Sequence, residues 1–295
     1  MHLEFSSVEL DLFAVATSIG QVTLFRITLS EHVEFKPIRV LPICCNTTLI
    51  LHLNWSQGLS GQSDLALALS DGCIAVVAIG AETHRIRFVR AHSLETWYVA
   101  WQRHFPKTLF SGGDDSCLCV TEGGFQDKEN PVHADEDEGN HSYPLTIDKR
   151  THTAGVTVVF SLGHHEDESV ILTGSYDEHM RVLKQSPKKA SWDTVLEVAL
   201  GGGVWRISPL LRHIQHPEAI ERGWESSFVV SCMHAGPKIV SIAYSGEAWS
   251  AKVIAQFSEH ESMNYASEAT TFQATRSVSI VSTSFYDKKV CLWHL

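Results

Sequence analysis

The chain reads ILTGSYDEHMRVL from Ile171 to Leu183. Apolar residues lead into a small polar turn, and a segment of alternating apolar residues leads out of it. This pattern predicts two antiparallel strands and is typical of the inner hairpin of a WD-repeat propeller blade. Asp-Gly or Asn-Gly is common in such a turn, whereas this chain has Asp177, Glu178 and His179. The acid pair and the histidine either shape the turn or belong to a reactive site.

The hairpin pattern occurs six times, over residues 12–27, 65–79, 108–120, 171–183, 228–242 and 278–295. The turn residues Asp71 and Asp115 are 44 positions apart, which matches the roughly 40–45 residues of a four-stranded blade. We therefore expect an all-β, WD40-type β-propeller of the seven-bladed family, with six repeats readable and the first blade short or missing. A closed six-bladed ring and a truncated seven-bladed ring both remain open.

The later turns are 62, 57 and 53 residues apart, so these blades need insertions. Residues 122–149 are rich in Asp and Glu, with Gly, Asn and Pro between them, and predict an acidic loop. Residues 209–227 contain two prolines among charged residues and predict a second insertion. We expect residues 1–295 to form a single propeller domain with these two insertions.

The composition predicts a soluble globular protein, with 44% hydrophobic and 19% charged residues. The net charge of −11 argues against nucleic-acid binding, which needs a basic surface. No apolar run approaches the roughly 20 residues that span a bilayer, and the first residues do not resemble a signal peptide. The seven cysteines show no pairing pattern and predict reduced thiols. We expect a cytoplasmic monomer that binds neither membrane nor nucleic acid.

Five short motifs carry a more specific signal. In order along the chain they read SGGDD (111–115), TGSYDEH (173–179), GGVWR (202–206), CMH (232–234) and SFYD (284–287). Together they resemble the WD-repeat diphthine methylesterase family of the diphthamide pathway. The segment HESM at 260–263 is also similar to that family's loop before its last blade. The resemblance covers roughly residues 65–295.

The resemblance implies both a fold and a reaction. The fold is a seven-bladed propeller. The reaction is hydrolysis of the methyl ester on a modified histidine of translation elongation factor 2, which releases methanol before a final amidation. Elongation factor 2 carrying methylated diphthine is then the expected partner. At the N-terminus, where the family has its first blade, this sequence departs from the pattern.

Ester hydrolysis needs an activated water or nucleophile, a stabiliser for the oxyanion and a proton for the leaving alkoxide. The chain has no Gly-x-Ser-x-Gly elbow and no His-Glu-x-x-His motif, so we expect a metal-independent site without a cofactor. An imidazole has an ordinary pKa of about 6.5 and accepts a proton from water near neutral pH. A neighbouring carboxylate can orient the ring, as in hydrolase triads.

Four residues are the catalytic candidates. Either His179 or His234 is the general base, Glu178 orients it, and Arg206 stabilises the oxyanion with help from Tyr286. Each also has a structural interpretation. Glu178 and the two histidines would then be ordinary turn residues, and Arg206 would form a salt bridge to a neighbouring blade.

The substrate-binding candidates lie on the same predicted rim: Trp205, Tyr286, Asp287, Asp114, His260 and Glu95. The resemblance implies a substrate with a trimethylammonio group, which suits aromatic and acidic walls. Turn aspartates such as Asp177 and Asp287 also fit a purely structural role, because WD repeats use them to accept hydrogen bonds. His92 and His152 match the structural histidine of the repeat.

A non-catalytic alternative remains beside the esterase. WD propellers commonly serve as scaffolds, and in that case the polar rim would only bind a partner protein. The two hypotheses differ in their products, since only the esterase releases methanol.

Overall fold

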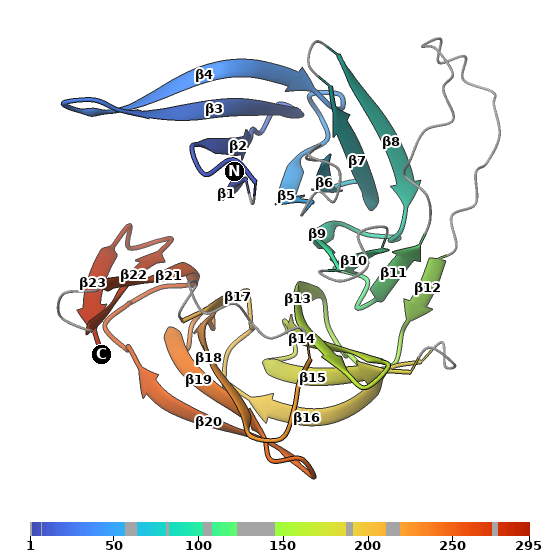
Figure 1. The fold of residues 1–295 in the computed structure, drawn as a ribbon, viewed down its shortest axis with the longest axis vertical. Coiled ribbons are helices and arrows are strands. Elements are labelled where there is room, and N and C mark those ends of the chain that lie inside the picture. The colour runs from blue at the N-terminus through green and yellow to red at the C-terminus, as the bar shows by residue number, and fades with distance from the viewer. Residues whose placement is uncertain are drawn as a thin grey trace. The chain divides into compact units, whose positions relative to one another are not determined.

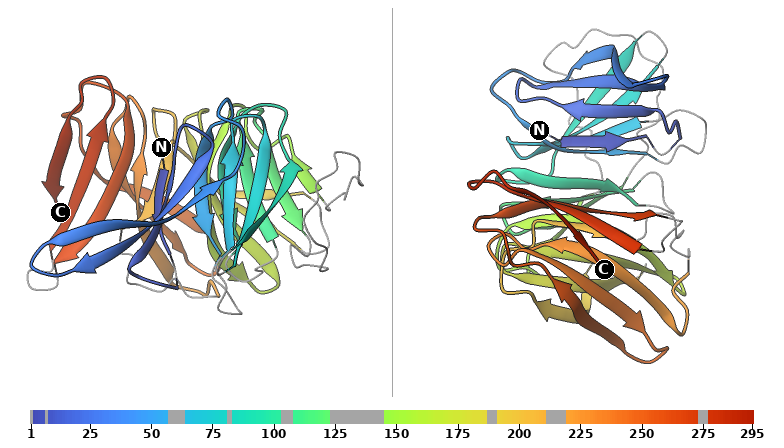
Figure 2. Two further views of the ribbon diagram at one scale, coloured as in Figure 1. Left: turned by 90° about the horizontal axis from the view of Figure 1, so that it is seen from above. Right: turned by 90° about the vertical axis from the view of Figure 1, so that its left-hand side faces the viewer.

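The computed structural model describes residues 2–6, 8–56, 64–80, 83–102, 108–122, 145–186, 191–210, 219–272 and 277–295. The described residues form strands and turns, with no helix among them. The strands build six antiparallel sheets in which each strand pairs with its neighbour in the chain (Figures 1 and 2). This confirms the predicted all-β, WD40-type fold and its six repeats. Contacts divide the chain into two compact units, residues 1–147 and 148–295.

The first unit contains three four-stranded sheets. The first sheet consists of β1 (His2–Phe5), β2 (Leu12–Ala16), β3 (Gln21–Leu29) and β4 (Val33–Pro42). The second consists of β5 (Ile50–Trp55), β6 (Asp64–Leu69), β7 (Cys73–Ile79) and β8 (His84–Arg90). The third consists of β9 (Thr96–Trp101), β10 (Thr108–Gly113), β11 (Leu118–Glu122) and β12 (Leu145–Asp148).

The second unit contains two four-stranded sheets and one of three strands. The fourth sheet consists of β13 (Val156–His165), β14 (Glu168–Ser175), β15 (His179–Gln185) and β16 (Asp193–Ala199). The fifth consists of β17 (Arg206–Pro209), β18 (Trp224–Ser231), β19 (Pro237–Tyr244) and β20 (Trp249–Gln256). The sixth consists of β21 (Asn264–Phe272), β22 (Ser277–Ser284) and β23 (Val290–His294).

The burial pattern explains why the middle strands were easy to recognise. In β14 every residue from Val170 to Ser175 is buried, so both faces of the strand pack against neighbours. In the outer strand β16 no residue is fully buried, and partly buried positions alternate with exposed ones from Leu196 to Ala199, since only one face is covered. The apolar β14–β15 hairpin is therefore the part of the blade with the clearest signal.

The sheet with the fewest described strands is not the first one, which the sequence predicts to be short or missing. The first hairpin belongs to a complete four-stranded sheet, and the sixth sheet is the one with three described strands. Leu145–Asp148, predicted as part of the acidic loop, form β12 and pair with β11. The rest of that predicted loop, residues 123–144, lies outside the described residues, as do residues 211–218 of the second predicted insertion.

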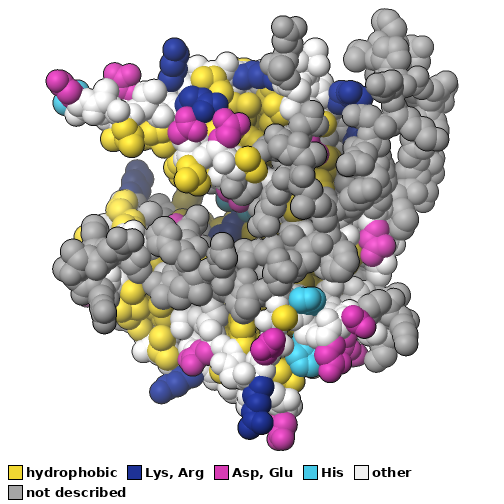
Figure 3. All heavy atoms as spheres, viewed as in Figure 1, with side chains coloured by type: hydrophobic (Ala, Val, Ile, Leu, Met, Phe, Trp, Pro, Cys, Tyr) yellow, Lys and Arg dark blue, Asp and Glu magenta, His cyan; other side chains and the backbone are white. Residues whose placement is uncertain are grey.

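Exposed hydrophobic side chains gather on the long β3–β4 hairpin of the first unit. Val33 and Phe35 are 58% and 60% exposed. Figure 3 shows hydrophobic side chains in yellow along this hairpin. The hairpin carries none of the candidate site residues, so Phe35 provides a control position for experiments on exposed aromatic residues.

Candidate functional site

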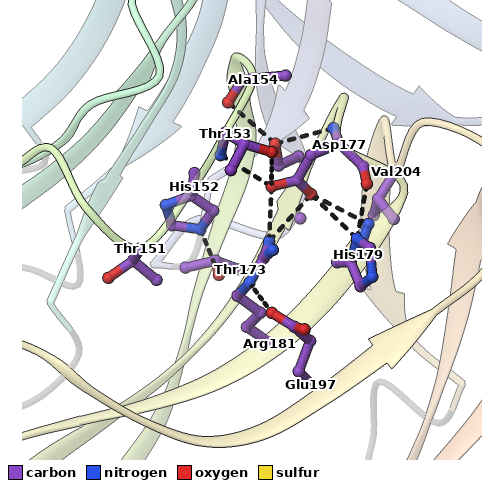
Figure 4. Close-up of polar contacts among 12 residues, drawn as sticks. Thr151, His152, Thr153, Ala154, Thr173, Asp177, His179, Arg181, Glu197 and Val204 are labelled. Atoms are coloured by element: carbon purple, nitrogen blue, oxygen red, sulfur yellow. Dashed lines mark hydrogen bonds and ion pairs between the residues drawn. The ribbon is translucent and has the colours of Figure 1, made fainter.

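The turn between β14 and β15 is built around the carboxylate of Asp177. It accepts hydrogen bonds from the backbone nitrogens of Thr153 and His179, both at 3.1 Å. Arg181 Nη1 lies 2.9 Å from the carboxylate, and Arg181 Nε donates to Glu197 at 2.6 Å (Figure 4). Burial opposes ionisation, but the hydrogen bonds from Arg181 and Thr153 outweigh it and lower the pKa of the Asp177 carboxyl. The turn therefore carries a fixed negative charge at neutral pH.

His152 lies beside this turn and is a structural residue. Its Nε2 is 2.9 Å from Thr173 Oγ1, and its Nδ1 has no hydrogen-bond partner among the described residues. Burial, and then the nearby charge of Arg181, lower the pKa of His152 to about 4. In the third sheet His92 Nδ1 contacts the turn carboxylate of Asp115 at 2.9 Å. In the fourth sheet Arg181 takes the corresponding contact with the turn aspartate.

His179 has a fixed tautomer and an accessible ring. Its Nδ1 lies 2.6 Å from the backbone carbonyl oxygen of Asp177 and 3.7 Å from the Asp177 Oδ1 atom. A carbonyl oxygen can only accept, so Nδ1 carries the proton and Nε2 of the neutral ring keeps its lone pair. The side chain is 33% exposed. The arrangement gives a base that water can reach, with a carboxylate nearby to stabilise the imidazolium.

Glu178 has a backbone position that the repeat imposes. Its φ is +69°, in the left-handed region that favours glycine. The same turn position is left-handed at Ser116, Lys288 and Gly72, with φ of +62°, +54° and +88°. The Glu178 side chain is exposed. The sequence predicts that Glu178 orients the base, but the groups in contact with the His179 ring belong to Asp177.

Arg206 and Trp205 form a cation–π pair at the entrance to β17. The Arg206 guanidinium carbon lies 4.5 Å from the centroid of the Trp205 ring. Its Nη1 donates to the backbone oxygens of Thr157 and Trp205, both at 2.8 Å. The guanidinium is therefore held in place in part by backbone oxygens.

Trp205 is also the centre of a row of aromatic side chains. The ring of Tyr176, on the same turn as His179, stacks on Trp205 with 5.8 Å between centroids. Trp205 also makes an edge-to-face contact with Tyr265, with 5.3 Å between the ring centroids. Tyr265 contacts Phe285 at 5.8 Å, and Phe285 contacts Tyr286 at 5.1 Å. The row thus links the β14–β15 turn, the start of β17, the start of β21 and the β22–β23 turn.

Three members of this row, Tyr176, Tyr265 and Phe285, are not among the site residues predicted from the sequence. Tyr176 and Tyr286 occupy the same position of their turns, one residue before the turn aspartate. Aligning the turns to one another would have identified Tyr176 from its equivalence to Tyr286. Tyr265 carries no such signal, because it lies in a strand and only the packing of β21 brings it to Trp205.

His234 lies on the β18–β19 turn and is exposed. In this turn Gly236 takes the left-handed position, with φ of +71°, so His234 corresponds to Tyr176 and not to the turn aspartate. The turn packs closely on the segment before β17, since a Cβ on Gly203 would lie 2.7 Å from Met233 Sδ. His234 therefore lies on a turn next to the segment that carries Trp205. Of the two candidate histidines, His179 is the one with a hydrogen bond that fixes its tautomer.

The other predicted binding residues have internal hydrogen bonds. In the first unit Asp114 accepts from the Trp97 indole at 2.9 Å, and the Asp114 backbone nitrogen donates to the Glu95 carbonyl oxygen at 2.8 Å. In the second unit His260 Nε2 lies 2.8 Å from Ser282 Oγ. Asp287 accepts from the Glu261 backbone nitrogen at 3.1 Å and from Ser284. Each of these contacts stabilises a turn.

The described residues also bear on other kinds of site. They contain no group of three or more His, Cys, Asp or Glu side chains that could hold a metal ion. They also contain no helix with the length and apolar character needed to cross a bilayer. All seven cysteines of the chain are described, and all are free thiols.

The similar sequences among known proteins share one name, diphthine methyltransferase. The chain is 27% identical over 295 residues to a fission yeast protein, Diphthine methyltransferase of Schizosaccharomyces pombe, covering 99% of this chain and 78% of the relative. It is 27% identical over 248 residues to Diphthine methyltransferase of Homo sapiens, covering 78% of this chain and 46% of the relative. The Dictyostelium discoideum Diphthine methyltransferase homolog is also 27% identical, over 234 residues. The chain thus spans less than half the length of its human relative.

These relatives confirm the relationship that the five turn motifs indicate. No protein-family model matches the chain. Among solved structures, a chain of "Crystal Structure of Mitotic Checkpoint Complex" superposes with a TM-score of 0.65 at 14% identity, covering 99% of this chain and 73% of that one. At this identity the likeness concerns the fold alone.

Proposed function

We propose that this chain, a homologue of proteins named diphthine methyltransferase, removes the methyl ester from methylated diphthine on translation elongation factor 2. The reaction is carboxylic-ester hydrolysis without a metal or cofactor, and it takes place in the cytoplasm on a monomeric enzyme. The observation that carries this proposal is the hydrogen bond of 2.6 Å between His179 Nδ1 and the Asp177 carbonyl oxygen. That bond leaves Nε2 as a base on a partly exposed ring.

In the proposed reaction His179 Nε2 takes a proton from water while the water oxygen attacks the ester carbonyl carbon. Negative charge develops on the former carbonyl oxygen, and Arg206 with the Tyr286 hydroxyl stabilises it. The intermediate then collapses with cleavage of the bond from carbonyl carbon to methoxy oxygen. The methoxy oxygen takes the proton from the imidazolium, so the products are the free carboxylic acid of diphthine and methanol.

Asp177 supplies what the base needs from its surroundings. Its carbonyl oxygen fixes the tautomer, and its ionised carboxylate at 3.7 Å stabilises the imidazolium that forms. Since Arg181 also contacts this carboxylate, the stabilisation is partly neutralised. We assign Asp177 to the orienting role in place of Glu178.

Methanol release from methylated elongation factor 2 tests the base assignment. Wild type, His179→Gln and His234→Gln are compared, with His32→Gln on the exposed β3–β4 loop as a matched control. We expect His179→Gln to lose at least about 100-fold in rate, the contribution typical of a general base. His234→Gln and His32→Gln should stay within about threefold of wild type. Full activity of His179→Gln would overturn the assignment.

A scaffold function is the second candidate. The exposed rings of Phe285 and Tyr286 favour it, because aromatic side chains are enriched in protein interfaces. A scaffold would bind elongation factor 2 with equal affinity whether or not diphthine is methylated, and it would release no methanol. A binding measurement on both forms of the factor, beside the methanol assay, separates the two functions.

A further inference from the structure

Three aromatic rings in the sixth sheet stand nearly at right angles to one another. Tyr265 and Phe285 meet with an interplanar angle of 82°, and Phe285 and Tyr286 meet at 89°. Phe285 is 64% exposed and Tyr286 is 72% exposed. We call these three residues the aromatic corner. Two of its walls face solvent, although burying either ring would lower the free energy of the folded protein.

Hydrogen bonds hold the backbone of the two exposed aromatic residues in place. The Phe285 nitrogen donates to the Met263 carbonyl oxygen at 3.0 Å, and the Tyr286 nitrogen donates to Ser262 Oγ at 2.9 Å. Both acceptors lie on the loop that leads into β21, directly before Tyr265. The two segments of the corner are thus tied together through two hydrogen bonds.

The neighbouring pair of Arg206 and Trp205 shows that one ring of this row already makes a cation–π contact. Trp205 contacts Tyr265 and already has a cation over its ring, at 4.5 Å. Ring faces carry the negative part of the aromatic quadrupole, so the exposed rings of Phe285 and Tyr286 attract a bulky, weakly hydrated cation. The net charge of the chain, −11, also favours a cationic ligand.

We infer that Tyr265, Phe285 and Tyr286 together bind a quaternary ammonium group. The identity of the natural ligand as the trimethylammonio group of methylated diphthine rests on the proposed function. Tyr265 and Phe285 are then specificity residues, since they recognise a part of the substrate that does not react. An uncharged apolar group of the same shape would bind more weakly, because it lacks the attraction to the ring faces.

A pair of small probes tests the charge preference. Binding of two probes is followed by NMR titration of the full chain. One is tetramethylammonium, and the other is tert-butyl alcohol, a neutral molecule of similar size and shape. We expect tetramethylammonium to bind at least about threefold more tightly and to shift the ring resonances of Tyr265 and Phe285. Equal binding of the two probes would overturn the inference, since the corner would then be a general apolar surface.

Matched substitutions test the ring requirement. Tyr265→Leu and Phe285→Leu should each weaken tetramethylammonium binding by about two- to fivefold, whereas Tyr265→Phe keeps the ring and should bind as wild type. Phe35→Leu removes an equally exposed ring in the first unit and serves as the control. Unchanged binding in both leucine variants of the corner would contradict the inference. Far-UV circular dichroism checks that each variant is folded.

Kinetics separate this inference from the proposed function. If the chain is the esterase, Phe285→Leu should raise KM for the methylated factor about two- to fivefold and leave kcat unchanged. If wild type releases no methanol but still binds tetramethylammonium more tightly than tert-butyl alcohol, the proposed function fails and the ammonium site stands. If methanol is released and Phe285→Leu changes neither KM nor binding, the ammonium site fails alone.

Discussion

Among single residues, the proton on His179 Nδ1 has the best-defined position. The contact of His179 Nδ1 with the Asp177 carbonyl oxygen follows from the turn, because residues 177 and 179 flank the left-handed Glu178. The sequence identified His179 and Glu178 as unusual but assigned the orienting role to Glu178. Spacing alone could not distinguish the two carboxylates, since the backbone conformation decides which one faces the ring.

Replacing Glu178 with glycine should separate stability from activity. A side chain in the left-handed region costs about 1 kcal/mol relative to glycine. We expect Glu178→Gly to raise the free energy of unfolding by up to about 1 kcal/mol in urea denaturation, offset in part by the entropy of glycine in the unfolded chain. Methanol release by this variant should stay within about threefold of wild type if Asp177 orients the base. A loss of about 100-fold would return the orienting role to Glu178.

The buried His152 should make stability depend on pH. Its pKa falls from an ordinary value of about 6.5 in the unfolded chain to about 4 in the folded protein, through burial and then the Arg181 charge. The unfolded chain therefore binds the extra proton between these values, and stability present above pH 6.5 is lost as the pH falls towards 4. The full loss is about 3 kcal/mol.

Urea unfolding at pH 7.0 and 4.5 measures this effect. His152→Asn lacks the titrating ring, so its stability should fall less between the two pH values than that of wild type. His32→Asn, on an exposed loop, should behave as wild type does. Equal pH dependence in His152→Asn and wild type would show that His152 is not responsible.

At the scale of elements, the turns of the six blades place the candidate residues. Each turn has a residue in the left-handed conformation. In the fourth and sixth blades the residue two places before it is a tyrosine of the aromatic row, Tyr176 and Tyr286. The fifth blade has His234 there and lacks a turn aspartate, since Ala235 stands in its place. Sequence spacing counted His234 as the turn aspartate, an error of one residue that only the φ angles reveal.

Close packing of the β14 strand against the segment before β17 fixes the two site elements relative to one another. A Cβ on Gly174 would lie 2.3 Å from Val204 Cγ1 and 2.7 Å from Val158 Cγ1. Gly174→Ala should therefore destabilise the protein by about 1–3 kcal/mol. Val204→Ala makes room for the new methyl group, so the double variant should be more stable than the sum of the single effects predicts. Additive effects would contradict this packing.

At the scale of the whole molecule, the local patterns could be predicted and the long-range pairings could not. The six hairpins are recognisable in the sequence because each consists of two apolar strands joined by a short polar turn. The pairing of β12 with β11 across residues 123–144, and the position of the three-stranded sheet, depend on contacts far apart in the sequence. The contact of Tyr265 with Trp205 is of the same long-range kind.

In the proposed reaction, water attacks the acyl carbon of the diphthine methyl ester. Mass spectrometry of the reaction in ¹⁸O-labelled water tests it directly. We predict one ¹⁸O atom in the diphthine carboxylate and none in the methanol, because the bond from carbonyl carbon to methoxy oxygen breaks. Label in the methanol would mean transfer of the methyl group itself, and absence of methanol would mean no hydrolysis; either result would contradict the account.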